Sequence, residues 1–159
     1  MTENISITVT VNGTVHKAEV EPRLLLADFL RENLDLTGTH VGCEHGICGA
    51  CTILMNGDSV RSCLTLAVQA DGATVETVES LGDIENLGPL QEAFREHHAL
   101  QCGFCTPGML MTATDMLRKY DLATDEDIRD GLSGNLCRCT GYQNIVAAVR
   151  AAADRRGAK

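Results

Sequence analysis

The order of apolar and polar positions predicts a first half built mainly of strands. Residues 5–11 alternate strictly between apolar and polar side chains, which is the pattern of a strand with one buried face. Asn12 and Gly13 follow and are typical of a tight hairpin turn. Residues 14–20, although less regular, are therefore predicted to be the returning strand.

Three further elements complete this half. Pro22 is predicted to open a helix whose apolar face is formed by Leu24, Leu25, Phe29, Leu30 and Leu34. Residues 51–55 and 58–63 predict a second hairpin that turns at Asn56 and Gly57. Residues 73–78 predict a last strand.

The second half has the periodicity of helices. The first predicted helix covers residues 89–99, and the second begins with Thr106 as N-cap and Pro107 in the first turn and runs to Tyr120. A third is capped by Thr124, with Asp127 at the capping-box position, and runs to about Leu132. The fourth starts at Thr140 or Gly141 and ends near Arg155.

The strand pattern gives way to the helix pattern between residues 79 and 87. This change predicts an α+β chain with two domains, residues 1–80 and residues 81–159. Charge is also uneven, because the first 80 residues hold 4 basic and 11 acidic residues and the remainder hold 9 and 11, within a net charge of -9. So acidic a surface argues against nucleic acid or an anionic membrane as partner. An acidic surface is suited to docking onto other proteins, and the need to keep the protein soluble explains the same charge equally well.

The cysteines decide the chemistry. Residues 1–4 lack the basic and apolar regions of a signal peptide, and no apolar run approaches the length of a membrane span. We therefore expect the chain to be cytoplasmic, and in the cytoplasm thiols stay reduced. Eight cysteines in such a chain indicate metal ligands before disulfides.

The first set is Cys43, Cys48, Cys51 and Cys63. The spacing of the first three is that of plant-type [2Fe–2S] sites. Glycines at 42, 46 and 49 are expected to supply unusual backbone angles and to let amide N–H groups approach the sulfurs. The register of the second hairpin places Cys51 opposite Ser62, which brings Cys63 back beside Cys51. The four thiolates therefore converge.

The second set is Cys102, Cys105, Cys137 and Cys139. Cys102 and Cys105 precede one predicted helix, and the other two cysteines precede the last predicted helix. Two helix N-termini are therefore expected to face a shared tetrathiolate and to favour its negative charge. A single residue separates Cys137 from Cys139, which is unusual for zinc sites. Zinc stays open as an alternative metal for either set, in a structural adaptor without a redox role.

Three segments resemble the iron–sulfur motifs of the xanthine oxidase (molybdenum hydroxylase) family. They are residues 42–52 (GCEHGICGACT), 101–108 (QCGFCTPG) and 134–142 (GNLCRCTGY). The resemblance covers nearly the whole chain. In length the chain is similar to the separate small iron–sulfur subunit of multi-subunit bacterial members.

The resemblance implies a ferredoxin-like β-grasp domain followed by an all-α four-helix [2Fe–2S]-binding domain. It also implies an electron-transfer subunit with two [2Fe–2S] clusters. Its partners would be a large subunit with a molybdenum–pterin cofactor and a medium subunit with FAD, in a dimer of heterotrimers. The substrate of such a complex is an aldehyde or an N-heterocycle.

Two residues acquire roles from the resemblance alone. Gln101 matches a residue that hydrogen-bonds the pterin, and Cys139 matches the cluster ligand nearest the pterin amino group. A free-standing ferredoxin shuttle is the other alternative. Gln101 and the long helical half argue against it, because a shuttle needs only one small cluster domain.

Overall fold

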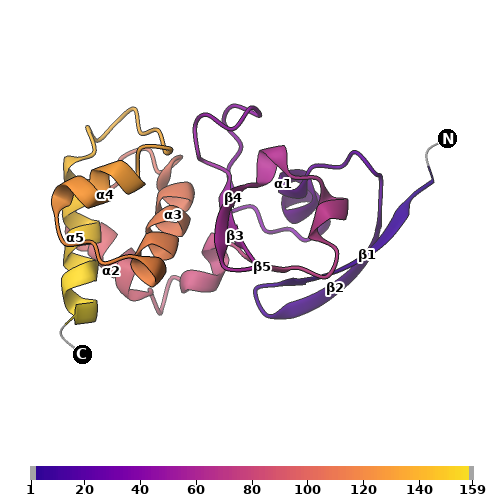
Figure 1. Cartoon of the computed structure of the whole chain (residues 1–159), viewed down its shortest axis with the longest axis horizontal. Helices are drawn as coiled ribbons and strands as arrows, with labels where there is room; N and C mark the ends of the chain where they lie inside the picture. The colour runs from indigo at the N-terminus through magenta and orange to yellow at the C-terminus, as the bar shows by residue number, and fades with distance from the viewer. Residues whose placement is uncertain (1–2, 158–159) are drawn as a thin grey trace.

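The computed structural model describes residues 3–157 and divides into a sheet half and a helical half (Figure 1). The sheet half contains β1 (Ile5–Val11), β2 (Thr14–Val20), α1 (Leu26–Asp28), β3 (Thr52–Met55), β4 (Asp58–Arg61) and β5 (Thr74–Glu76). The helical half contains α2 (Pro89–Glu96), α3 (Thr106–Lys119), α4 (Asp125–Gly131) and α5 (Gln143–Gly157). None of the helices in the described range is long and apolar enough to cross a membrane.

The five strands form one mixed sheet in the order β2-β1-β5-β3-β4. β1 pairs antiparallel with β2 and parallel with β5, and β3 pairs antiparallel with β5 and β4. Both predicted hairpin turns are present, since Asn12, Gly13, Asn56 and Gly57 all have positive φ. The first two strands match their predicted bounds, whereas the last three are shorter than predicted.

The predicted helix at Pro22 is wrong in its start. The helix begins at Leu26, and residues 29–33 continue it as a wider π-helical turn. The cause is a long-range backbone contact: Leu25 forms a β-bridge with Leu66, and the N–H of Leu26 donates to the carbonyl of Thr65 at 2.7 Å. These bonds hold Leu25 extended, and residues 22 and 23 form a turn before it.

The core of the sheet half lies between the sheet and the α1 segment. Alternate residues of β1 point inward, as the sequence pattern predicts, and they pack with the apolar side chains of α1 and β3. The largest fully buried members are Ile7, Leu26, Phe29, Leu30 and Ile53.

Two helix starts differ from the prediction. Thr106 is the first residue of α3 and Cys105 is the N-cap, so Thr106 does not cap the helix. α5 begins at Gln143 because Gly141 and Tyr142 adopt left-handed φ angles of 64° and 68°, which no helix can accommodate. The capping box of Thr124 and Asp127 at α4 is confirmed.

The helical half has its own core. Its large buried side chains are Phe94, Met109, Ile128, Leu132 and Ile145. Ala148 and Ala152 are buried on α5, and α5 packs mainly against α2. Small side chains let two helix backbones approach closely, which explains how an alanine-rich helix contributes to the core.

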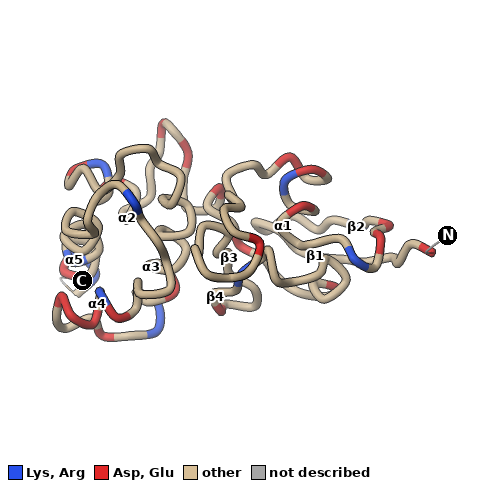
Figure 2. Tube along the Cα trace, turned by 90° about the horizontal axis from the view of Figure 1, so that it is seen from above, with Lys and Arg blue, Asp and Glu red and all other residues tan. Residues whose placement is uncertain are grey.

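The two halves meet where α3 packs on β3 and β4. At the start of α3 a Cβ on Gly108 would lie 2.2 Å from the carbonyl oxygen of Gly49, so only glycine fits there. Near its end, Arg118 forms two hydrogen bonds to Glu76 at 2.7 and 2.8 Å. The acidic surface of the sheet half and the more mixed charge of the helical half can be followed in Figure 2.

Candidate metal centres

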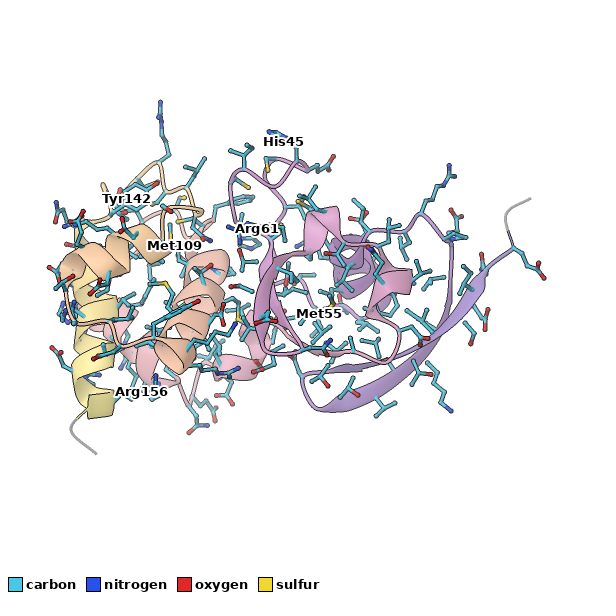
Figure 3. The ribbon with its side chains drawn as sticks, in the orientation of Figure 1. His45, Met55, Arg61, Met109, Tyr142 and Arg156 are labelled. Carbon is cyan, nitrogen blue, oxygen red and sulfur yellow. The ribbon has the colours of Figure 1, made fainter. Side chains whose placement is uncertain are left out.

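The first cysteine loop projects from the sheet half, and His45 lies at its tip (Figure 3). The backbone N–H of Cys48 donates to the Sγ of Cys43 at 3.4 Å. Backbone N–H groups of Cys48 and His45 lower the pKa of the Cys43 thiol to about 6. Amide hydrogens aimed at a sulfur favour its thiolate form, which is the form that binds a metal.

The glycines of this loop have different roles. Gly46 and Gly49 have φ angles of 80° and 71°, as their expected role requires. Gly42 does not have a positive φ, so the expectation of an unusual angle is wrong there. A Cβ at Gly42 would instead lie 3.2 Å from both the Sγ of Cys48 and the ring of Phe104. Glycine therefore leaves space beside a cysteine sulfur.

The hairpin brings the fourth cysteine back to the loop. Thr52 pairs with Arg61 and Met55 with Asp58, and the N–H of Ser62 donates to the carbonyl of Cys51 at 3.3 Å. The side chains of Cys51 and Cys63 are within hydrogen-bonding reach of each other. Burial raises the pKa of the Cys63 thiol to about 11, and its neighbour Cys51 adds to the effect.

The chain segments that carry the second set lie at the end of the helical half on the same side of the molecule as the first cysteine loop (Figure 1). The sulfurs of Cys102 and Cys139 are 3.5 Å apart, although 37 residues separate them in the chain. Cys105 and Cys137 form a second close pair. Burial raises the pKa of the Cys105 thiol to about 12. Burial acts to raise the pKa of the Cys137 thiol, but hydrogen bonds from Thr140, Cys139 and Cys105 together outweigh it and lower that pKa.

The expectation that two helix N-termini adjoin this set is half correct. α3 begins at Thr106, directly after Cys105, whereas α5 begins only at Gln143. The segment between Cys139 and α5 contributes side chains instead. The hydroxyl of Thr140 lies 3.1 Å from the Sγ of Cys137, and the N–H of Cys137 donates to the hydroxyl of Tyr142 at 2.9 Å.

The side chains of Cys43 and Cys48 are also within hydrogen-bonding reach of each other, so each set consists of two close pairs of thiols. Within residues 3–157 no group of three or more His, Cys, Asp or Glu residues is close enough to surround a single metal ion. A [2Fe–2S] cluster instead needs four thiolates, two for each iron. The buried hydroxyl of Thr106, next to Cys105, has no hydrogen-bond partner in the protein and so leaves a donor for a bound group. The four thiols gathered in each set therefore supply the number of thiolates that a [2Fe–2S] cluster requires.

Gln101 lies beside the second set on an exposed loop. Its side-chain Nε2 donates to the carbonyl oxygen of Cys139 at 3.1 Å. This bond fixes the amide relative to Cys139 and leaves the side-chain oxygen available. The structure thus brings together the two residues to which the resemblance gave a pterin-contacting role.

The two cysteine sets are joined by hydrogen bonds that the sequence analysis did not identify. The N–H of Leu136 donates to the carbonyl of Cys48 at 2.9 Å. The buried amide of Asn135 donates to the carbonyl of Gly49 at 3.0 Å and accepts from Thr112 at 3.0 Å. Asn135 and Leu136 are the two residues before Cys137. Their place inside a cysteine motif was the feature of the sequence that could have indicated a role at the site.

Arg61 forms a second bridge between the halves and is labelled in Figure 3. Its guanidinium donates to the hydroxyl of Thr52 at 2.6 Å and to the carbonyl of Gly134 at 2.7 Å. One side chain on β4 thereby ties the first cysteine hairpin to the loop that carries Cys137.

Comparison with known proteins agrees with this geometry. Residues 9–79 match a 2Fe-2S iron-sulfur cluster binding domain, and residues 77–150 match a second [2Fe-2S] binding domain. The chain is therefore an iron–sulfur protein with two cluster-binding domains.

Its relatives are subunits of larger oxidoreductases. The chain is 58% identical to the caffeine dehydrogenase subunit gamma of Pseudomonas sp. (strain CBB1), over 91% of this chain and 88% of the relative. It is 57% identical to the nicotine 6-hydroxylase small subunit of Paenarthrobacter nicotinovorans, over 99% and 94%. The quinoline 2-oxidoreductase structure from Pseudomonas putida 86 superposes with a TM-score of 0.92 at 53% identity, covering 98% of both chains.

The chain belongs to the small iron–sulfur subunits of the xanthine oxidase family of molybdenum hydroxylases. Its function in that family is electron transfer. The predicted family, the electron-transfer function and the oxidoreductase class are thereby confirmed, whereas the predicted domain bounds, residues 1–80 and 81–159, stay a prediction.

Proposed function

We propose that this chain relays single electrons from a molybdenum–pterin centre in a large subunit to FAD in a medium subunit. The observation that carries the proposal is the arrangement of eight free cysteines in two sets of paired thiols, whose loops are joined by the hydrogen bond between Leu136 and Cys48. When bound, two [2Fe–2S] clusters supply the one-electron chemistry. The protein supplies the ligands, the spacing between them and the surfaces that meet the partners.

The ligand sets follow the two domains. Cys43, Cys48, Cys51 and Cys63 hold the cluster of the ferredoxin-like domain, residues 1–80. Cys102, Cys105, Cys137 and Cys139 hold the cluster of the helical domain, residues 81–159, which we treat as a four-helix unit. The close pairs support a further assignment: Cys102 with Cys139 on one iron, and Cys105 with Cys137 on the other.

The connection between the sets supports electron transfer between the two domains. Cys48 belongs to one set and Leu136 directly precedes Cys137 of the other. The hydrogen bond between the Cys48 carbonyl and the Leu136 N–H therefore joins two ligands through covalent bonds and a single hydrogen bond. Such a short bonded route is suited to electron transfer between the two centres without movement of either domain.

Gln101 is proposed to contact the pterin. One N–H of its Nε2 donates to the Cys139 carbonyl, and the second N–H and the side-chain oxygen are left to pair with the mixed acceptor and donor groups of a heterocycle edge. Cys139 is exposed beside it, at the position proposed to lie nearest the pterin. The same loop region is therefore proposed to face the large subunit.

Exposed apolar side chains support docking at both sets. Large apolar residues on the surface next to the cysteines are Ile47, Leu64, Leu100, Phe104 and Leu136. Apolar side chains clustered on a surface mark sites of protein contact. We propose that Leu100, Phe104 and Leu136 meet the large subunit, and that Ile47 and Leu64 meet the medium subunit.

The names of the relatives suggest the substrate class. Caffeine and nicotine are N-heterocycles, and another relative, from Escherichia coli (strain K12), is an aldehyde oxidoreductase iron-sulfur-binding subunit. We propose an N-heterocycle or an aldehyde as substrate of the complex. We also propose a cytoplasmic location, where the ligand thiols stay reduced, and a dimer of heterotrimers.

Purification of the tagged chain from its native host tests this function. The expected product contains iron, molybdenum and flavin together with two larger subunits. Recovery of the folded, iron-loaded chain without molybdenum or larger subunits would instead favour a free-standing shuttle.

A further inference from the structure

Thr140 and Tyr142 form a closed set of hydrogen bonds around Cys137. The N–H of Tyr142 donates to the Thr140 hydroxyl at 3.1 Å, and that hydroxyl lies 3.1 Å from the Sγ of Cys137. The N–H of Cys137 donates in turn to the hydroxyl of Tyr142 at 2.9 Å. Figure 3 shows Tyr142 in the loop region above α5.

The donors and acceptors of this set fix its direction. A threonine hydroxyl has one hydrogen to donate and lone pairs that accept. The Tyr142 N–H uses a lone pair of Thr140, so the hydroxyl hydrogen remains free for another acceptor. A metal-bound thiolate has no hydrogen, so in that state the contact between Thr140 and Cys137 must run from the hydroxyl to the sulfur.

The backbone holds the set in place. Tyr142 has a φ of 68°, which is uncommon for a residue with a bulky side chain and is kept only where the surroundings enforce it. Its ring packs against the helical core, and its carbonyl accepts from the N–H of Val146 in the first turn of α5. The orientation of the Thr140 hydroxyl is thus anchored in the core and in α5.

This contact is specific to one centre. Among residues 3–157, Thr140 is the side-chain hydroxyl that hydrogen-bonds a cysteine sulfur, whereas Cys43 in the other set receives a backbone N–H at 3.4 Å. Sequence analysis gave Thr140 only a possible role at a helix start. In the structure its hydroxyl lies beside the Cys137 sulfur, which indicates a role at the metal centre.

We propose that Thr140, oriented by Tyr142, raises the reduction potential of the helical-domain centre by donating a hydrogen bond to the Cys137 thiolate. The inference rests on the proposed function, in which Cys137 is a ligand of that centre. Reduction adds one negative charge to a cluster and its thiolates, so a donor to a ligand sulfur stabilises the reduced form more than the oxidised form. Thr140 acts through Cys137 and is a positioning residue.

The test compares three substitutions at this position in the full chain carrying both centres. Thr140→Val and Thr140→Ala remove the hydroxyl, and Thr140→Ser keeps it. Reductive titration followed by electron paramagnetic resonance gives the potential of each centre separately. We expect Val and Ala to disfavour reduction of the helical-domain centre about three- to tenfold, where tenfold is about 59 mV for one electron. Ser should restore the wild-type potential.

A second measurement does not depend on the potential. Pulsed hyperfine spectroscopy of the reduced centre in D2O should detect an exchangeable hydrogen near the helical-domain centre in the wild type and in Thr140→Ser. Thr140→Val and Thr140→Ala should lack the coupling of the hydroxyl hydrogen and should keep those of the backbone N–H groups of residue 140 and Cys139, which also approach the Cys137 sulfur. The matched control is Thr114→Val on α3, whose hydroxyl donates to the Leu110 carbonyl at 2.8 Å within the same domain. Thr114→Val should leave the reduction potentials of both centres unchanged.

Three outcomes would overturn the proposal. The first is a wild-type potential in the hydroxyl-free variants, and the second is an equal change in both centres. The third is loss of the helical-domain centre in both hydroxyl-free variants, which would make Thr140 an assembly residue. Absence of that centre from the wild-type protein is a different result, since it contradicts the proposed ligand set itself.

Discussion

The backbone N–H of Leu136 lies 2.9 Å from the carbonyl oxygen of Cys48 and donates a hydrogen bond to it. This bond places the two cysteine sets in a fixed relation, although their loops belong to different halves of the chain. It uses main-chain atoms only, so it does not depend on the Cys48 side chain. Side-chain ligation and domain contact are therefore separable by substitution.

Cys48→Ala should remove the centre of the ferredoxin-like domain and spare the helical-domain centre. The substitution deletes one thiolate but keeps the carbonyl that binds Leu136. Electron paramagnetic resonance of the reduced variant should show a single remaining signal, and electrons should no longer reach flavin in the complex. Loss of both signals from folded protein would mean that the two centres assemble as one unit.

Asn135→Asp should weaken the contact between the halves. It replaces the buried donor to the Gly49 carbonyl with an oxygen, and a buried polar group left without a partner costs about 1–3 kcal/mol. Urea unfolding followed by circular dichroism measures the loss in the free energy of unfolding. Asn144→Asp is the control, because Asn144 also donates to a carbonyl, that of His98, but is exposed. An equal loss in both variants would contradict the role of Asn135.

Asp115 should make the contact of α3 with β4 sensitive to acid. Burial acts to raise the pKa of Asp115, but hydrogen bonds from Lys119 and Ser59 outweigh it and hold the pKa below its ordinary value of 3.8. A lowered pKa contributes stability that is fully present above the ordinary value and is lost as pH falls through the folded-state value.

Asp115→Asn should therefore be less stable than the wild type at pH 6, and the difference in the free energy of unfolding should shrink below about pH 4. Asp121→Asn, at an exposed carboxylate just after α3, is the control for general acid effects. A difference that stays constant down to pH 3 would show that the Asp115 carboxylate does not stabilise the fold through its charge.

Gln101→Leu should keep both centres and impair contact with the pterin. No thiolate is removed, but pterin polar groups facing a leucine would be buried without partners, at about 1–3 kcal/mol for each group. Cofactor content and the rate at which substrate reduces the helical-domain centre are the measurements. Gln143→Leu, at an exposed residue of α5, is the control. Wild-type retention and rate in Gln101→Leu would leave Gln101 as an ordinary loop residue.

The sequence was sufficient wherever local patterns determine the structure. Strict alternation gave β1 its exact bounds, and the Asn56–Gly57 turn fixed the register that returns Cys63 to Cys51. The cysteine motifs predicted the family, which the two matching cluster-binding domains confirm, and the two ligand sets stay a prediction.

The features that the sequence did not predict depend on contacts between residues that are far apart in the chain or on unusual backbone angles. The start of α1 is set by a bridge between Leu25 and Leu66, and no local pattern carries that information. The hydrogen bonds of Thr140 and Tyr142 depend on a left-handed tyrosine, and helical periodicity gives no warning of one. The buried position of Asn135 is likewise visible only after the two halves meet.

Iron and acid-labile sulfide analysis of the purified full chain, combined with its visible spectrum, tests the central claim most directly. Two tetrathiolate [2Fe–2S] centres require about four irons and about four sulfides per chain and a brown-red oxidised protein. We predict that composition, with both signals appearing on reduction. A well-folded, colourless protein with one zinc in each cysteine set and no iron would contradict the electron-transfer function.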